Sequence, residues 1–280
     1  MLDELVATMG IWLPKLTEHG EFGDDAHRLT ERTRTQPLTV SGATIDRLLK
    51  PTRDGMRLTG ISGTKAGPLL RTSITVRKAG DEHEQTPAFC EIDLVLHCGP
   101  TLKGEFARTL TVTDVHIGWA GERDLFFTRA RPDHSNDNAH VEQKNGDVVR
   151  RHAFHYRYDT PAELRLLNEL YALVRVRLNL FTATTRAIGY RTNRNGKSVR
   201  VYDKPRTPYQ RVIDSGVLTT AKAAELTALF KNTNPAELTR QITAIQTRLS
   251  HLAAAKTTAL SAGTSRAKPG EARTHHSRAS

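Results

Sequence analysis

The middle of the chain alternates hydrophobic and polar positions in a way that predicts β-strands. The run FCEIDLVLHCG (Phe89–Gly99) reads as a buried strand interrupted by an acid, and ARTLTVTDVHIGW (Ala107–Trp119) alternates and is rich in β-branched residues. Because the turn sequence LKGE lies between them, we predict an antiparallel hairpin. The shorter runs SITVRK and DLFFTRARP, the second of which ends at Pro132, predict further short strands.

Two later segments show the 3.6-residue period of amphipathic helices. The segment TPAELRLLNELYALVRVRL begins with Thr160, Pro161 and Glu163, the capping-box pattern of a helix start. Its apolar stripe consists of Leu164, Leu167, Tyr171, Val174 and Leu178.

The second helical segment, NPAELTRQITAIQTRLSHLAAA, repeats this start with Asn234, Pro235 and Glu237. After Ala255 the chain is rich in Ala, Ser, Thr and Lys, with Leu260 as its one large apolar residue. Such a composition buries too little surface to order itself, so we predict a disordered tail over residues 256–280.

The N-terminal region, residues 1–57, is predicted to be helical. Ser41 can cap a helix from about Gly42 to Leu49 that turns Thr44, Asp46 and Arg47 outward. This arrangement is compatible with a helix-turn-helix that reads DNA, although an ordinary helical hairpin explains the spacing better. Residues 58–84 contain several glycines and Pro68 and are predicted to form a linker.

The charge of the chain favours a polyanionic partner. Lys and Arg number 41 against 30 acids, a formal net charge of +11, and nucleic acid is the first candidate. The segment 183–255 begins with a basic stretch in which Tyr190, Tyr202 and Tyr209 are interleaved with cations. Its candidate DNA contacts are Arg191, Arg194, Lys197 and Arg200. A solvated basic hairpin explains this stretch equally well.

Other features exclude several protein classes. The sequence has no run of 18 apolar residues and no charged-then-apolar leader, so we predict a cytoplasmic protein with no membrane partner. Cys90 and Cys98 are too few for a disulfide framework and are interpreted as reduced core thiols.

Two carboxylates are candidate ligands of a divalent cation. Asp93 lies inside the first predicted strand, where an unpaired acid is costly to bury. Glu142 lies in the first turns of a helix predicted within HSNDNAHVEQKNGDVVRRHAF (His134–Phe154). Metal-dependent phosphoryl transfer on DNA needs several hard oxygen ligands held close together. Taken singly, each acid is better explained as an ordinary salt-bridged or solvated residue; together they suggest a metal site.

Four segments resemble the integrase catalytic core of bacterial insertion-sequence transposases: EIDLVLHCG, TLTVTDVHIGW, FFTRARPDHSNDNAHVEQKN and RRHAFHYRYDT. The resemblance extends from about Ala43 to Leu252 and is strongest at NDNAHVEQKN. It implies an α/β fold, a ribonuclease H-like mixed sheet with helices over residues 85–182. It also implies metal-assisted DNA strand transfer by an Asp–Asp–Glu triad with Mg²⁺ or Mn²⁺, the ends of an insertion element as partner, and a homo-oligomer.

The resemblance assigns roles to particular residues. Asp93 matches the first catalytic acid and Glu142 the third. Asn138 matches the amide beside the motif, and Lys144 matches a position suited to contact with a DNA phosphate. The candidate DNA contacts also include Arg150, Arg151 and Arg47.

The middle acid of the triad has no counterpart in this sequence. After Trp119 only five residues precede LFFTRARP, too few for a further strand and a crossover helix. We therefore predict a truncated core, with an internal deletion near Ala120–Arg123. Asp114, which ends the second strand, is a substitute ligand that would approach the metal from the side. Asp124 would lie at the wrong end of its strand.

Three functions follow from these observations. The first is an integrase-core transposase by descent that is impaired in catalysis, because catalytic residues that act as a unit lose most of the rate when one is removed. The second is a non-enzymatic DNA-binding protein that competes with an intact transposase. The third is an RNA-binding protein, which the scattered tyrosines and the lack of an aromatic sheet motif make the weakest.

Overall fold

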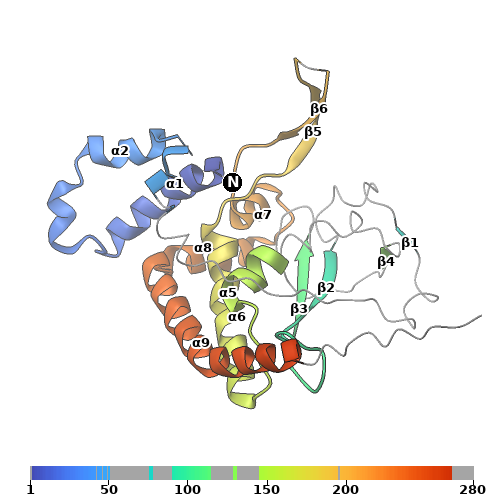
Figure 1. Ribbon diagram of the computed structural model, residues 1–280. Coiled ribbons are helices and arrows are strands. Elements are labelled where there is room, and N and C mark those ends of the chain that lie inside the picture. Colours follow the sequence, from blue (N-terminus) through green and yellow to red (C-terminus); the bar gives the residue numbers. More distant parts are fainter. Residues whose placement is uncertain are drawn as a thin grey trace, which may run out of the picture.

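The computed structural model describes residues 2–41, 43–45, 47–48, 50, 76–77, 90–114, 129–130, 145–194 and 196–266. Helices form the body of the described chain, and two β-hairpins lie at its sides (Figure 1). Among these residues no helix is both long and apolar enough to cross a membrane.

The core forms where two long helices pack together, α6 (Pro161–Phe181) and α9 (Pro235–Arg266). Their buried faces share one apolar cluster that includes Leu167, Leu170, Ile242 and Leu249. Helix α1 (Leu2–Glu18) joins this cluster through Ile11 and Trp12, and the indole Nε1 of Trp12 donates to the carbonyl oxygen of Phe181 at 3.0 Å.

Both predicted helix starts are confirmed. The Thr160 side chain accepts from the Glu163 backbone N–H while Glu163 caps the Thr160 N–H in return, the two halves of a capping box. At α9, Asn234 Oδ1 accepts from the backbone N–H groups of Ala236 and Glu237 at 3.0 and 3.4 Å.

The predicted stripe of α6 is correct in part. Leu167 and Val174 are buried, but Leu164 is 46% exposed, whereas Leu166 and Leu170 are buried. The buried face therefore lies slightly around the helix from the predicted stripe, because α6 packs against α9 and also contacts α1, α5 and α7.

Helix α9 continues to Arg266, past Ala255, where the composition predicted that ordered structure would end. Lys256 Nζ donates to Asp159 and Glu163, and Thr257 Oγ1 accepts from the Arg157 backbone N–H at 2.9 Å. Polar contacts to residues 157–163 thus hold a segment that has little apolar surface of its own.

The predicted hairpin is confirmed as β2 (Cys90–Leu96) and β3 (Arg108–Asp114), antiparallel in a continuous register. A short parallel pair joins β1 (Val76–Arg77) to β4 (Arg129–Ala130), and β5 (Ala187–Thr192) pairs with β6 (Ser198–Tyr202). Each sheet within the described residues has two strands. The mixed sheet of a ribonuclease H-like core therefore stays a prediction.

The remaining described elements are short or peripheral. They are the 3₁₀ helix η1 (Gly23–Arg28), α2 (Glu31–Thr39), the π-helical turn η5 (Asn145–Arg150), α5 (Arg151–Ala153), α7 (Pro208–Asp214) and α8 (Thr220–Asn232). The predicted cap at Ser41 is present, since its Oγ accepts from the Thr44 N–H at 3.3 Å. Ile45 is buried there, but Leu48 is 72% exposed. Of the predicted linker, only residues 76–77 are described.

Candidate functional site

The candidate site begins at one face of the β2–β3 hairpin. In the register Asp93 lies opposite Thr111, and Glu91 lies opposite Thr113. Cross-strand partners share a face of an antiparallel pair, and so do residues two apart on one strand. Glu91, Thr111 and Thr113 are buried, and the turn η5 contacts β2. The polar face of this hairpin is therefore the covered one.

Asp93 is held by two donors on this face. Its Oδ1 accepts from the Leu94 backbone N–H at 2.8 Å, and its Oδ2 accepts from Asn145 Nδ2 at 2.5 Å. Asn145 opens η5 and is also the last residue of the motif NDNAHVEQKN. The fold thus joins the end of that motif to the strand acid.

Two buried oxygens beside Asp93, Asn145 Oδ1 and Thr111 Oγ1, have no hydrogen-bond partner among the described residues. Carboxylate, amide and hydroxyl oxygens are the ligands that Mg²⁺ and Mn²⁺ prefer, so this donor set fits such a cation in its chemistry. No group of three His, Cys, Asp or Glu suited to a metal ion occurs within the described part of the chain. Glu142, the predicted second ligand, lies outside the described residues.

Asp114 does not share this face. It lies opposite Cys90, three positions from Thr111, and an odd spacing on a regular strand places two side chains on opposite faces. Its side chain is buried, and burial together with the Asp114 carboxylate raises the pKa of the Cys90 thiol. The structure therefore does not bring Asp114 to Asp93 as a side-on metal ligand.

Glu91 is a further acid of this face that was not predicted from the sequence. It precedes Asp93 by two positions, lies on the same face and is buried. The signal was present in the sequence, because an acid at positions i and i+2 of a strand predicts two carboxylates on one face.

A buried polar group continues this face beyond Asp93. His97 is fully buried, and its Nε2 lies 2.8 Å from Thr109 Oγ1 and 3.3 Å from the Tyr171 hydroxyl. Burial, together with the nearby charge of Arg150, lowers the pKa of His97 to about 3. The imidazole is neutral in the folded protein near pH 7.

Arg150, predicted to contact DNA, points inward. It is half-buried, and its Nη2 donates to the Leu96 carbonyl oxygen at 3.0 Å; burial lowers the pKa of its guanidinium. It therefore positions η5 against β2. Arg151 and Arg47 are exposed, and Arg47 Nη2 donates to Thr44 Oγ1 at 3.3 Å. Asn138 and Lys144 lie outside the described residues.

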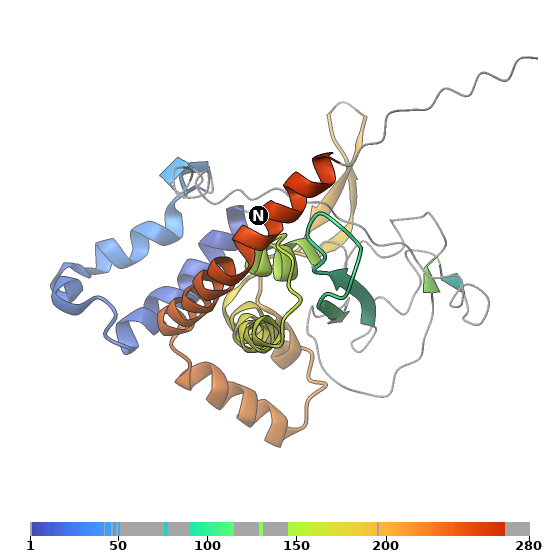
Figure 2. The same ribbon diagram turned by 60° about the horizontal axis from the view of Figure 1, so that its bottom comes forward.

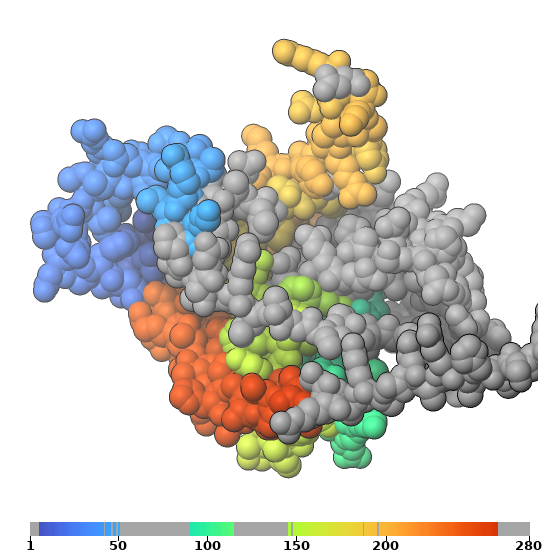
Figure 3. All heavy atoms as spheres, in the orientation of Figure 1, coloured from blue at the N-terminus to red at the C-terminus, as the bar shows by residue number. Residues whose placement is uncertain are grey.

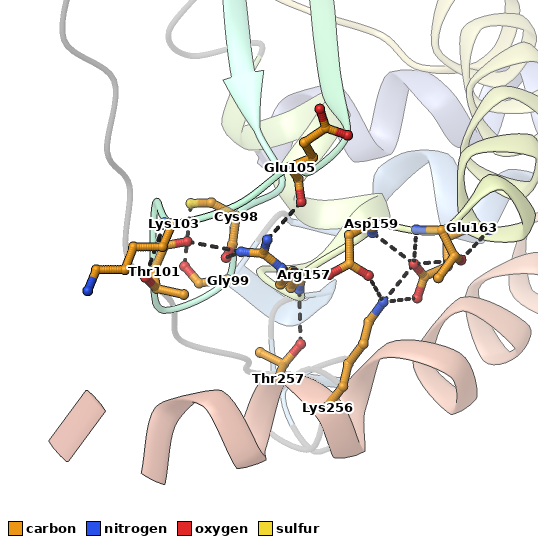
Figure 4. A network of polar contacts seen from close by, with 11 residues as sticks. Cys98, Gly99, Thr101, Lys103, Glu105, Arg157, Asp159, Glu163, Lys256 and Thr257 are labelled. Carbon is orange, nitrogen blue, oxygen red and sulfur yellow. Dashed lines mark hydrogen bonds and ion pairs between the residues drawn. The ribbon is translucent and has the colours of Figure 1, made fainter. Parts of the chain in front are cut away.

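Arg157 anchors the end of the same hairpin and was not identified from the sequence (Figure 4). Its guanidinium donates to the carbonyl oxygens of Cys98, Thr101 and Glu105, and its Nε pairs with Asp159 Oδ2 at 2.7 Å. Its own backbone N–H is bound by α9. Through these contacts Arg157 joins the β2–β3 loop to α9 and to Asp159, just before the start of α6.

The remaining candidate DNA contacts are on the β5–β6 hairpin. Arg191, Arg194, Lys197 and Arg200 are all exposed. The hairpin projects away from the helical body, and both orientations show this (Figures 1 and 2). At its base an open cavity of about 440 Å³ is lined by several charged groups, including Arg186, Asp203 and Lys204.

Comparison with known proteins gives a relative but no named activity. The sequence matches no protein-family profile and no solved structure. It is 30% identical over 251 residues to the "Uncharacterized protein y4rM" of Sinorhizobium fredii (strain NBRC 101917 / NGR234), a match that covers 72% of this chain and 69% of y4rM. The alignment is 251 positions long, which is more than 72% of the 280 residues of this chain, so it includes y4rM residues that are aligned with gaps in this chain. The chain belongs to the family of y4rM.

Proposed function

We propose that this chain is a DNA-binding protein of insertion-sequence origin, related to integrase-core transposases and impaired in strand transfer. One observation carries the proposal: Asn145, the last residue of NDNAHVEQKN, donates to the Asp93 carboxylate at 2.5 Å. The resemblance implies that Glu142 of that motif binds the same cation as Asp93. Glu142 precedes Asn145 by three positions, and in the helix predicted from the sequence this spacing puts two residues on one face.

A divalent cation in this site would be held by Asp93 and Glu142. The bound cation would supply Lewis acidity to a phosphodiester and lower the pKa of a bound water. The chain's own contribution is to orient the acid. The Leu94 N–H and the Asn145 amide fix both oxygens of Asp93, and Arg150 holds η5 to the end of its strand.

Two findings support impairment. Asp114, the predicted substitute ligand, lies on the opposite face from Asp93. The alignment to y4rM also includes positions that have no residue here, which an internal deletion would produce. Loss of one carboxylate from a three-acid site weakens metal binding and misplaces the reacting groups.

DNA binding is supported by charge and exposure. The chain carries a formal net charge of +11, and six of its candidate cations are exposed: Arg47, Arg151, Arg191, Arg194, Lys197 and Arg200. Exposed cations that replace counterions on phosphates give affinity that falls steeply with salt.

The proposal is tested with the full-length chain in two assays. Fluorescence anisotropy on a labelled duplex should give an affinity whose logarithm falls linearly with the logarithm of salt concentration. Supercoiled plasmid with Mg²⁺ or Mn²⁺ should be nicked no faster by the wild type than by Glu142→Gln. Nicking that Glu142→Gln abolishes would overturn the impairment, and salt-independent or absent binding would overturn the DNA-binding role.

A second candidate is a non-enzymatic competitor of an intact transposase, which the Ser41-capped turn with its exposed Arg47 favours. A competitor must recognise element ends. Binding to terminal repeats should therefore exceed binding to random duplex, and equal affinity for both would rule this candidate out.

A further inference from the structure

The β5–β6 hairpin is a two-stranded ribbon, and most of its described side chains are exposed. Its residues 187–202 include the four cations Arg191, Arg194, Lys197 and Arg200 and no acid. Tyr190 is 69% exposed, and Ile188 and Tyr202 are also exposed. In the space-filling view the ribbon rises clear of the other described segments (Figure 3). A hairpin gains little stability by itself, so its exposed surface suits a partner, and the charge makes that partner a polyanion.

The register divides the ribbon into two chemically different faces. Tyr190 lies opposite Arg200 and Thr192 opposite Ser198, and Tyr202, two positions after Arg200, shares their face. We call this set, Tyr190, Thr192, Ser198, Arg200 and Tyr202, the hydroxyl face. The other side, the valine face, carries Arg191, Val199 and Val201.

The hydroxyl face is equipped for polar recognition. It presents four hydroxyl groups around one guanidinium, and all five side chains are exposed. Hydrogen bonding to Tyr190, with a second bond to Tyr202, raises the pKa of Arg200. The two phenols therefore hold a permanent cation between them. Hydroxyl and guanidinium groups bind both phosphate oxygens and base edges in DNA.

The ribbon is ordered at both ends. At its tip the Gly196 N–H donates to the Asn193 carbonyl oxygen at 3.0 Å, Asn193 Oδ1 accepts from the Lys197 N–H at 2.9 Å, and Gly196 has the positive φ that this turn requires.

At its base, Asp203 Oδ1 accepts from the Arg186 N–H at 2.7 Å, and Asp203 pairs with Arg211 of α7. The ribbon is thus presented in a fixed direction from the helical body.

We propose that the β5–β6 ribbon enters the major groove of duplex DNA with its hydroxyl face toward the bases. The major groove is wide enough for a two-stranded ribbon, and the tip cations Arg194 and Lys197 would then flank the phosphates. This inference rests on the proposed DNA-binding function and adds the element, the face and the groove.

The test uses two matched variants, Arg200→Gln and Arg191→Gln, which remove the same charge from opposite faces of one ribbon. On a labelled random-sequence duplex at about 0.1 M salt, Arg200→Gln should weaken binding about tenfold or more, as for loss of a base or phosphate contact, and Arg191→Gln less than about threefold. Both side chains are exposed, so circular dichroism should show unchanged folding.

The groove is tested on the wild-type complex by chemical methylation. Bound protein should protect guanine N7, which lies in the major groove, and Arg200→Gln should reduce that protection. Equal weakening by the two variants, or protection of adenine N3 in the minor groove alone, would overturn the inference while leaving the DNA-binding function intact. A wild type that binds no duplex would instead overturn the function itself.

Discussion

The two hairpins of this chain have the same local construction and opposite surroundings. In β2–β3 the polar face, with Glu91, Asp93 and Thr111, is covered by η5. In β5–β6 the face with Tyr190 and Arg200 is open to solvent. When a polar face is covered, each hydrogen bond on it contributes to stability, because a buried donor or acceptor without a partner raises the free energy of the folded state. When a polar face is open to solvent, its hydrogen-bonding groups are available to a partner. Substitutions should therefore lower stability in the first hairpin and affinity in the second.

The largest effect is expected at Arg157, which holds the β2–β3 loop. Arg157→Met should lower the free energy of unfolding by about 3 to 5 kcal/mol, because three carbonyl oxygens lose this donor and Asp159 Oδ2 loses its ion pair. Urea denaturation measures this change. Arg206→Met, which breaks an exposed pair with Asp214 at the base of β5–β6, should cost less than about 1 kcal/mol. Equal losses would remove the contrast between the hairpins.

The next effect concerns pH and His97. Burial holds the pKa of His97 at about 3, below the ordinary 6.5, so between these values the unfolded chain binds a proton that the folded chain does not. The stabilisation is complete above pH 6.5 and is lost as the pH falls toward 3. From pH 6.5 to 5 the loss should be about 2 kcal/mol.

His97→Gln should flatten this dependence, measured as urea midpoints at several pH values. Burial also lowers the pKa of His155, so His155 binds its proton less readily in the folded chain than in the unfolded chain, and part of the slope should remain. His251→Gln, at an exposed position of α9, is the matched control and should keep the wild-type slope. An unchanged slope in His97→Gln would mean that this histidine is protonated in the folded state.

The sequence predicted the β2–β3 hairpin and the two helix caps, because alternation and capping patterns depend on neighbouring residues. It did not predict Arg157 as an anchor, since the carbonyls that Arg157 binds lie more than 50 positions away. The continuation of α9 past Ala255 was not predicted for the same reason, because the residues that bind Lys256 and Thr257, at positions 157–163, are distant in the sequence.

The candidate site was predicted unevenly. Asp93 was selected as an acid inside an apolar run, and its contact with Asn145 links it to the predicted motif. Arg150 was grouped with DNA contacts from its charge alone, but a side chain that reaches a backbone carbonyl of the neighbouring strand is turned inward. The residue type gives the charge of a side chain but not whether that side chain points inward or to solvent. The candidate cations of β5–β6 are exposed because they lie on a projecting ribbon.

A smaller effect is expected at Asn145 and sharpens the description of the covered face. Asn145→Asp would place a carboxylate against Asp93 and should destabilise the protein by about 1 to 3 kcal/mol without divalent cation. Millimolar Mg²⁺ should restore much of this loss in thermal melts, because it bridges the two carboxylates. Asn168→Asp, at an exposed position of α6, is the control and should show no such recovery. Identical Mg²⁺ responses would argue against an oxygen-lined cation site at Asp93.

The smallest effect on stability, and a distinct effect on solubility, is expected on the outer face of β2–β3. Leu94 and Leu110 lie opposite each other on that face, and Leu110 is 62% exposed. Exposed apolar pairs on a strand favour association. Leu110→Lys should therefore reduce light scattering at high protein concentration while changing the free energy of unfolding by less than about 0.5 kcal/mol. Val199→Lys is the matched change on β5–β6, where the net positive charge already opposes self-association, and it should alter scattering little. If Leu110→Lys instead unfolds the protein, the outer face of β2–β3 is packed against another part of the chain. The β2–β3 hairpin would then be covered on both faces, in contrast to the open β5–β6 hairpin.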